Sequence, residues 1–313
     1  MKDQVRGADV REAEAWVGWC CSYCAAPLEV RAHGLLCRAE GRFFADLEGV
    51  HRLLPEERRR ELLPAVELAQ RTRRDAGWRA EPGLPEVPPG HPHGEVWRRR
   101  ARALREGFAL AAERIDRGPW NVLEVGGGCG WAAARFLAAG HRVAAVDVNL
   151  DRADGLLATD RVTGGAALPR AEAELEALPV EPRRFDVVVT PCSLHQGARL
   201  SRALVELRRV TRRGGILLVL DSPVFRRRED GEAAVARVMR EQERRYRVCL
   251  PRESQPGYLV LGELPSLFAR AGWTAEVHGW PDRLREWAGD AWQALRHGRR
   301  GPRFPVLVAR RDG

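Results

Sequence analysis

From Glu95 onward the sequence alternates between two kinds of segment, and this alternation restricts the fold more than any other feature. Short runs of aliphatic and β-branched residues have the length of buried strands, and segments rich in Ala, Leu and Arg separate them. The predicted strands are residues 121–125, 142–146, 185–189, 215–220, 273–278 and 304–309. Such alternation is typical of a parallel sheet with helices on both faces. We therefore predict an α/β fold with a doubly wound sheet, whose ligands bind at the carboxyl ends of the strands.

The first predicted strand ends in a glycine-rich loop. It reads Glu124-Val-Gly126-Gly-Gly128-Cys-Gly130-Trp131, which is G-x-G-x-G preceded by an acidic residue, and a helix is predicted directly after it. Glycines allow a sharp turn and the close approach of a ligand, while the amides that begin the helix point at that ligand. The nicotinamide fingerprint G-x-G-x-x-G would need glycine where Trp131 stands. A loop without a binding role is the alternative.

The second predicted strand is followed by Asp147, about twenty residues beyond the first glycine. A carboxylate at this position can accept hydrogen bonds from both hydroxyls of a ribose. Together with the glycine loop it indicates a ligand that contains adenosine. The alternative is that Asp147 caps the segment that follows it.

The run VLEVGGGCGWAAARFLAAGHRVAAVDVNLD resembles the first motif, and the acidic strand end after it, of class I S-adenosylmethionine-dependent methyltransferases. The stretches AELEALPVEPRRFDVVV, SLHQ and LVELRRVTRRGGILLVLDSP resemble later motifs of the ubiquinone/menaquinone-biosynthesis-like branch. The resemblance covers residues 95 to 280 and, more weakly, 303–309, and it implies a mostly parallel, seven-stranded, Rossmann-like sheet. It also implies that S-adenosylmethionine is the cofactor, held by Glu124, Gly126, Gly128 and Gly130 at the methionine portion, Asp147 at the ribose and Glu174 near the adenine.

The segment Thr190-Pro-Cys-Ser-Leu-His-Gln196 follows the strand predicted at 185–189 and would face the transferred methyl group. His195 is a candidate general base because the unperturbed pKa of histidine lies near neutrality; the alternative is a loop histidine that is hydrogen-bonded to its neighbours. The Pro191-Cys192 pair resembles the nucleophile motif of cytosine-C5 methyltransferases. Cys192 is therefore an alternative catalytic residue, although a small residue filling this slot is favoured.

Four of the seven cysteines lie within the first 37 residues. Cys21, Cys24 and Cys37 follow the spacing of a zinc ribbon, and Glu40 stands where a fourth cysteine is expected. This stretch resembles the zinc-ribbon segments that precede some methyltransferases. The hypotheses are one structural zinc with Glu40 as the fourth ligand, zinc with another fourth ligand, or a metal-free relic in which the cysteines act as small hydrophobes. The other possible fourth ligands are Cys20, His33 and His51.

Composition divides the chain into three predicted regions: a ribbon-like module at 1–55, a linker at 56–94 and the methyltransferase domain at 95–313. The linker combines a probable helix over 56–74, interrupted at Pro64, with the stretch 81–94, in which eight of fourteen residues are Pro or Gly. A tryptophan-containing segment over 280–302 is predicted to form an amphipathic helix that either caps the acceptor or packs on the sheet.

The net charge of +9 is compatible with RNA binding. However, the arginine clusters lie beside acidic residues, which favours ordinary solvated surface. No apolar run is long enough to span a bilayer, and no signal peptide is evident, so we expect a cytoplasmic protein. The sequence predicts a methyltransferase for a small-molecule or lipid-like acceptor. The alternatives are an RNA methyltransferase whose ribbon contacts rRNA or tRNA, and a non-catalytic cofactor-binding scaffold or regulatory subunit.

Overall fold

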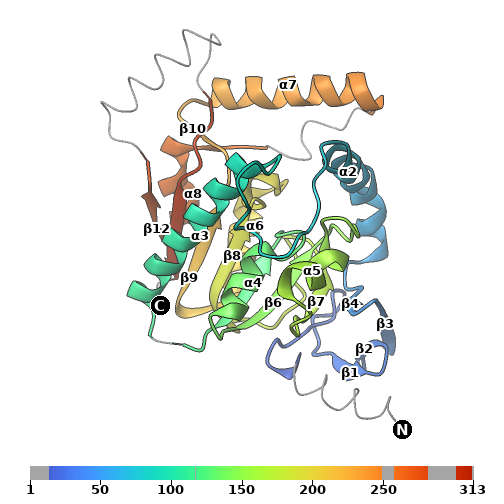
Figure 1. The fold of residues 1–313 in the computed structure, drawn as a ribbon. Coiled ribbons are helices and arrows are strands. Elements are labelled where there is room, and N and C mark those ends of the chain that lie inside the picture. Colours follow the sequence, from blue (N-terminus) through green and yellow to red (C-terminus); the bar gives the residue numbers. More distant parts are fainter. Residues whose placement is uncertain (1–13, 117, 249–256, 281–300, 312–313) are drawn as a thin grey trace.

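The computed structural model describes residues 14–116, 118–248, 257–280 and 301–311, and it contains the predicted doubly wound sheet (Figure 1). The central part of this sheet has seven strands in the order β7-β6-β5-β8-β9-β13-β12. These strands are β5 (Asn121–Val125), β6 (Arg142–Asp147), β7 (Arg170–Glu172), β8 (Phe185–Pro191), β9 (Thr211–Leu220), β12 (Trp273–His278) and β13 (Val306–Arg311). The first five are parallel, and β13 runs antiparallel to both β9 and β12. The predicted fold class is confirmed.

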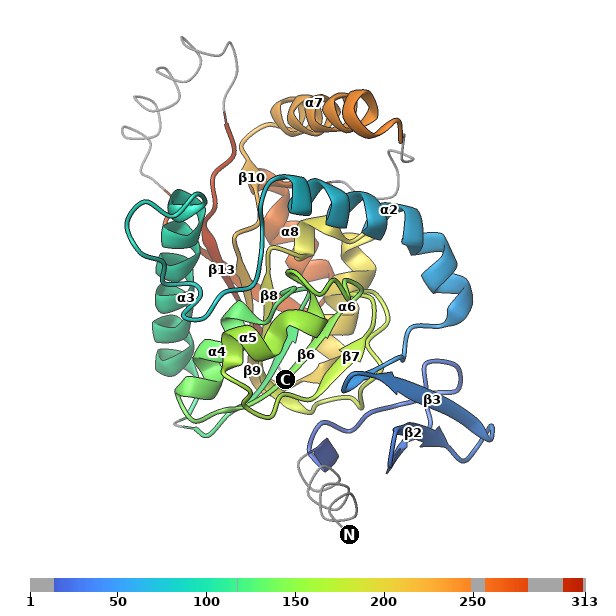
Figure 2. The ribbon, with the colours of Figure 1, turned by 45° about the vertical axis from the view of Figure 1, so that its right-hand side comes forward.

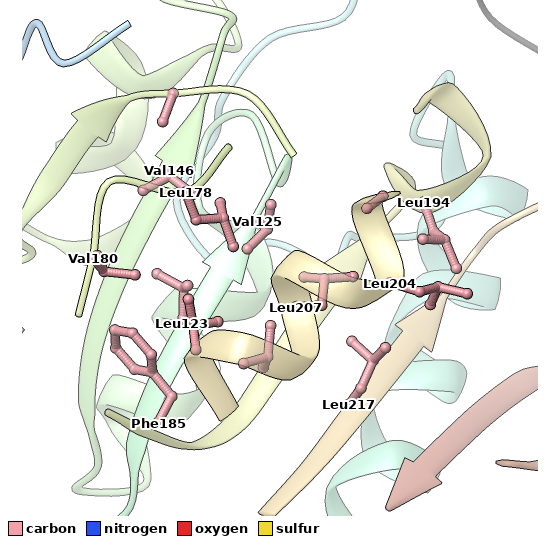
Figure 3. Close-up of a cluster of buried hydrophobic side chains, with 14 of the residues drawn as sticks. Leu123, Val125, Val146, Leu178, Val180, Phe185, Leu194, Leu204, Leu207 and Leu217 are labelled. Atoms are coloured by element: carbon pink, nitrogen blue, oxygen red, sulfur yellow. The ribbon is translucent and has the colours of Figure 1, made fainter. Parts of the chain in front are cut away.

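The sheet is buried on both faces because its strands are apolar on both faces. Leu217 and Val219 of β9 belong to one hydrophobic cluster, while Ile216, Leu218 and Leu220 belong to a second cluster on the opposite face. Successive side chains of a strand point to opposite faces, so a strand covered on both sides reads as a continuous apolar run. Figure 3 shows the first cluster, in which side chains of α6 pack against those of the strands.

Helices cover both faces of the sheet (Figure 1). One face is covered by α3 (Gly94–Arg114), α4 (Trp131–Ala138) and α5 (Thr159–Thr163), and the other by α6 (Leu200–Val210) and α8 (Leu264–Arg270). A further helix, α7 (Arg228–Tyr246), lies beyond the carboxyl ends of the strands, next to the short pair β10 (Val224–Phe225) and β11 (Leu259–Val260).

The N-terminal module is joined to the sheet, which the sequence did not predict. Its strands are β1 (Glu29–Arg31), β2 (Gly34–Cys37), β3 (Arg42–Leu47) and β4 (Val50–His51), and neighbouring strands pair antiparallel. The last of them, β4, also pairs in parallel with β7, matching Val50 to Arg170 and His51 to Ala171. The ribbon strands and the core strands therefore form one sheet of eleven strands.

The segment expected to be a linker forms the helix α2 (Glu56–Asp75), which crosses above the carboxyl ends of the core strands (Figure 2). The prediction that this helix is interrupted at Pro64 was wrong, because the helix continues through that residue. Proline removes one backbone hydrogen bond, and here ion pairs and apolar contacts to the core hold the helix on both sides of it. The Pro/Gly-rich stretch after α2 is not helical, as predicted, and it buries Leu84.

Two sequence predictions concern segments at the margins of this description. Residues 281–300, which make up most of the predicted amphipathic helix, lie outside the described residues. Within the described part of the chain, we find no helix with the length and apolar character that crossing a bilayer requires. The domain boundaries at 55 and 94 stay predictions.

Candidate active site

A cavity of about 250 Å³ lies at the carboxyl ends of the core strands, beneath α2. Its walls come from the loops that follow β5, β6, β7 and β8, together with the start of α4 and part of α3. One face of α2 forms its roof, through Arg58, Leu62, Ala65, Val66, Ala69 and Arg73. These six residues are spaced as neighbours on one side of a helix. The cavity therefore lies where the strand alternation predicted a ligand.

The glycines of the loop after β5 are required by close contacts. A Cβ atom on Gly126 would lie 2.2 Å from the Cβ of Ser193, and one on Gly128 would lie 2.7 Å from the carbonyl oxygen of Asp154. Gly126, Gly128 and Gly130 also have positive φ angles of 72°, 62° and 75°, a conformation that glycine adopts at little cost. Gly130 ends the loop as the residue that precedes α4.

Glu124 is buried behind this loop, directly under Gly127 and not among the residues that line the cavity, with one carboxylate oxygen satisfied. Oε1 accepts hydrogen bonds from the backbone N–H groups of Ala132 and Ala133, at 3.1 and 3.0 Å, whereas Oε2 is buried without a partner. Burial raises the pKa of Glu124 to about 7. A buried unpaired oxygen is costly, and an ammonium group such as that of the methionine portion of S-adenosylmethionine is the kind of partner that would satisfy it.

Asp147 lines the same cavity and fixes the shape of the glycine loop. Its Oδ2 accepts a hydrogen bond from the N–H of Gly128 at 2.7 Å, and its Oδ1 accepts one from the N–H of Asn149 at 2.8 Å. Burial raises the pKa of this carboxyl group. Each carboxylate oxygen has a second lone pair, so the side chain can still accept hydrogen bonds from the two hydroxyls of a ribose.

Glu174 lines the cavity and is tied to the roof. Its two oxygens accept hydrogen bonds from Arg58 Nε at 3.0 Å and Arg58 Nη2 at 2.7 Å. Glu172, two residues earlier at the end of β7, accepts a hydrogen bond from Arg59 Nη2 at 2.9 Å, and Asp154 pairs with Arg73. The carboxylates at the strand ends therefore hold α2 in place.

Cys192 also lines the cavity, and it has an uncommon backbone conformation, with φ at 66°. Its Sγ lies 2.9 Å from Arg100 Nη2 and donates to Asp221 Oδ2 at 2.8 Å. Asp221, at the end of β9, also has a positive φ, of 51°. Burial raises the pKa of Cys192 to about 12. The group is therefore a neutral thiol near pH 7, not the thiolate that nucleophilic catalysis needs.

His195 lies one short turn further along the chain, and it is not among the residues that line the cavity. Its Nδ1 is 3.1 Å from the hydroxyl of Ser222, and its carbonyl oxygen accepts a hydrogen bond from Gly257. Burial lowers the pKa of His195 to about 4. These contacts match the alternative of a loop histidine that is hydrogen-bonded to its neighbours, here from two later segments of the chain, and its catalytic role stays a prediction.

The N-terminal cysteines meet in a cluster. The sulfur atoms of Cys21, Cys24 and Cys37 all lie within 4.8 Å of one another, and Cys24 and Cys37 are 3.5 Å apart. Four ligands around zinc at about 2.3 Å bring sulfur atoms to similar separations. Among the described residues, only these three thiols form such a group. Both nitrogens of His51 are instead occupied by the carboxylates of Asp46 and Glu14.

Glu40 occupies the position that corresponds to Cys24 in the second turn of the ribbon. The residues that follow Cys24 and Glu40 are Ala25 and Gly41, and both have left-handed φ angles, 60° and 62°. The two turns therefore have similar geometry, and Glu40 stands where the second turn would present a ligand. Its Oε2 is 3.9 Å from Cys21 Sγ and accepts a hydrogen bond from Arg42 Nε at 3.3 Å.

Comparison with known proteins agrees with this geometry. A family model described as a methyltransferase domain matches residues 123–219. The ubiquinone/menaquinone biosynthesis C-methyltransferase UbiE of Rhizobium rhizogenes is 31% identical over 179 residues, which cover 48% of this chain and 67% of that protein. The malonyl-[acyl-carrier protein] O-methyltransferase of Erwinia billingiae is 33% identical over 115 residues, 36% of this chain and 43% of that protein. Among solved structures, 1,6-didemethyltoxoflavin-N1-methyltransferase of Burkholderia thailandensis has a TM-score of 0.45 and 17% identity over 87% of this chain and 96% of that one.

The strand order, the glycine loop and the acidic end of β6 define a class of enzymes that bind an adenosine-containing cofactor at the carboxyl edge of a seven-stranded sheet. Within that class, the match to the family model and to the UbiE proteins shows which family the chain belongs to. The chain belongs to the class I S-adenosylmethionine-dependent methyltransferases.

Sequence reasoning missed two parts of this site. The first is α2, whose sequence shows a helix but not its position. The second is the pair of Arg100 and Asp221, which meet across 121 residues of chain. A signal for Arg100 was present, because it occupies a buried position of α3 between Trp97 and Leu104. A charged residue within an apolar helical stripe indicates a buried partner.

Proposed function

We propose that this methyltransferase acts on a small organic acceptor bound in the cavity beneath α2. The observation that carries the proposal is that one cavity is lined both by the cofactor motifs and by Trp97, Arg100 and Cys192. A helix covers this cavity, and an enclosed, partly aromatic space suits a small molecule. The similarity to a ubiquinone/menaquinone biosynthesis C-methyltransferase also supports this proposal.

The chemistry divides between the cofactor and the chain. When bound, S-adenosylmethionine supplies an electrophilic methyl group, whose bond to sulfur breaks with the electron pair left on sulfur. Glu124 and Asp147 would orient the cofactor through its ammonium group and its ribose, and α2 would exclude water. The chain must also position the acceptor's electron pair in line with the methyl group, since alignment is the main contribution a protein makes to such a transfer.

The paired arginines of α2 and α3 count against the RNA alternative. Arg58, Arg59 and Arg60 form ion pairs with glutamates, and Arg99 and Arg100 both pair with Asp221. Arginines paired in this way have less charge to offer to phosphates. The scaffold alternative is disfavoured because the cavity is lined by Trp97, Arg100 and Cys192 as well as by the cofactor motifs, and these three side chains could contact an acceptor.

The test uses S-adenosylmethionine labelled on its methyl group, incubated with the protein and an extract separated into RNA and small-molecule fractions. The expected result is label in the small-molecule fraction that depends on the protein. An Asp147→Ala variant, which should not bind the cofactor, is the matched control. Label in RNA would refute the small-molecule assignment, and binding of the cofactor without transfer in either fraction would favour the scaffold.

We further propose that Cys21, Cys24 and Cys37 bind one structural zinc ion, with Glu40 as the fourth ligand. The clustered thiols and the matching turns at Ala25 and Gly41 support this assignment. Structural zinc is tetrahedral and fully ligated by the protein, and the carboxylate of Glu40 would reach it by a small rotation away from Arg42. Elemental analysis of protein purified without chelators should find one zinc per chain, and its absence would favour the metal-free relic.

A further inference from the structure

Arg100 is an arginine buried in an aromatic environment at the wall of the cavity. Its side chain is 9% exposed, and its guanidinium carbon lies 4.8, 5.2 and 5.6 Å from the ring centres of Trp97, Trp78 and Trp131. Cation–π contacts of this kind repay part of the cost of removing the charge from water. Both Trp97 and Trp131 line the cavity with it.

The hydrogen bonds of Arg100 leave donors available. Its Nε donates to Asp221 Oδ2 at 2.7 Å, and its Nη2 lies 2.9 Å from Cys192 Sγ. A guanidinium has five N–H groups, so these contacts use two of them. Among the described residues, none accepts a hydrogen bond from Nη1, and this atom is not fully buried. Because Arg100 lines the cavity, we take Nη1 as the donor available to a ligand there.

The charges around this point add up to an excess of one positive charge. Asp221 is the shared partner of Arg99 and Arg100. Burial alone would raise the pKa of Asp221, but the two arginines outweigh burial and lower it, so the carboxylate is ionised. With Cys192 neutral, two cations face one anion. Arg99 is 32% exposed, so solvent screens much of its charge, and a further anion would act mainly on the buried Arg100.

Backbone strain at the same point supports a binding role. Cys192 and Asp221 end the neighbouring strands β8 and β9, and both have positive φ angles although neither is glycine. Strain of this kind is maintained by the surrounding structure and clusters at ligand sites. Here it turns the two side chains toward Arg100 and fixes the direction of its guanidinium.

We propose that Arg100 binds an anionic group of the acceptor, and that the acceptor is a planar organic acid whose carboxylate or phenolate contacts Arg100 beside the rings of Trp97 and Trp131. This inference rests on the proposed function and names its substrate class. An ionised acceptor also suits the lining of the cavity, because no histidine is among the described residues that line it. Arg100 is then the residue that makes the enzyme prefer an anionic acceptor to a neutral one.

The test measures binding to protein saturated with S-adenosylhomocysteine, without turnover. The probes are benzoate, salicylate and 4-hydroxybenzoate, each compared with its neutral amide. Binding of each probe is measured by calorimetry and by tryptophan fluorescence. The unchanged protein should prefer the acids. Arg100→Gln should weaken acid binding roughly 10- to 100-fold, the range expected for lost charge-assisted hydrogen bonds, and should leave S-adenosylhomocysteine affinity unchanged. No measurable affinity for any acid, or equal affinity for acids and amides, would overturn the proposal.

Arg99→Gln is the matched control, because Arg99 pairs with the same carboxylate but does not line the cavity. Its acid affinity should stay within about threefold of the unchanged protein. If Arg100→Gln does not fold, Arg100→Lys keeps the charge and should keep the preference for acids; loss of that preference with normal S-adenosylhomocysteine binding counts against the proposal. The two proposals fail separately. Transfer to neutral small molecules only would refute the anionic acceptor, whereas acid binding with label in RNA would refute the small-molecule function.

Discussion

The ribbon and the core belong to one sheet but are held together by different means. All seven residues of β8 are buried, whereas only one of the six residues of β3 is. The core is stabilised by apolar burial on two faces. The ribbon contributes Val17, Trp19, Leu35, Phe44 and Leu53 to one of the two hydrophobic clusters, and it contains in addition the thiol cluster and the buried His51 with its two carboxylates. We therefore expect changes in solution conditions to affect the two regions separately, and four predictions test this difference.

The largest effect is expected from Cys37→Ser. Structural zinc contributes on the order of 10 kcal/mol to the folding of small zinc domains, so loss of one ligand should unfold the ribbon and release the metal. Zinc content and amide hydrogen exchange over residues 29–51 measure the result. Cys20→Ser is the control, since Cys20 is adjacent and buried but outside the cluster. Equal zinc content in both variants would contradict the assignment.

The next largest effect should be confined to the core. Asp147→Ala removes the proposed ribose acceptor, and two charge-assisted hydrogen bonds are worth roughly 3 kcal/mol or more together. Cofactor affinity measured by calorimetry should fall at least 100-fold, while zinc content stays unchanged. Asp160→Asn alters an exposed carboxylate in α5 and serves as the control. Near-normal cofactor affinity in Asp147→Ala would remove this residue from the site.

Glu124 should make the core less stable as the pH rises. Burial raises its folded pKa to about 7 from 4.5, so the folded state holds a proton that the unfolded state releases. The free energy of unfolding of the cofactor-free protein should fall between about pH 4.5 and 7, by on the order of 3 kcal/mol. Urea unfolding at a series of pH values measures the slope. Glu124→Gln should abolish it; an unchanged slope would mean that Glu124 titrates normally.

His51 should produce a loss of similar direction in the ribbon, at higher pH and of smaller size. Burial alone would lower the pKa of His51, but the carboxylates of Asp46 and Glu14 outweigh it and raise the pKa to about 9. Its contribution to stability is complete below about pH 6.5 and is lost as the pH rises through 9. Asp46 is partly exposed, so solvent screening reduces the effect to about 1–2 kcal/mol. Protection from hydrogen exchange within residues 42–51, taken relative to the intrinsic exchange rate at each pH, should fall over this range in the unchanged protein but not in His51→Gln.

How far the sequence predicted this structure depends on how local each signal was. The strand over residues 121–125 and the one over 273–278 were predicted with the correct ends because the first is a mostly apolar run and the second alternates apolar with polar residues. The three residues of β7 were too few to be recognised. The positions of β4 and α2, and the meeting of Arg100 with Asp221, depend on contacts more than 100 residues apart in the chain. No local pattern specifies such contacts.

The pairing of β4 with β7 has a consequence for the behaviour of the whole protein. An unpaired edge strand exposes backbone N–H and C=O groups to which another chain can add, and it is therefore a site of aggregation. Here β7 would be that edge, and β4 satisfies its outer hydrogen bonds within the same chain. A methyltransferase domain expressed without the ribbon would expose β7 as an unpaired edge strand next to its cofactor cavity. We therefore expect the domain without its ribbon to aggregate more readily than the whole chain.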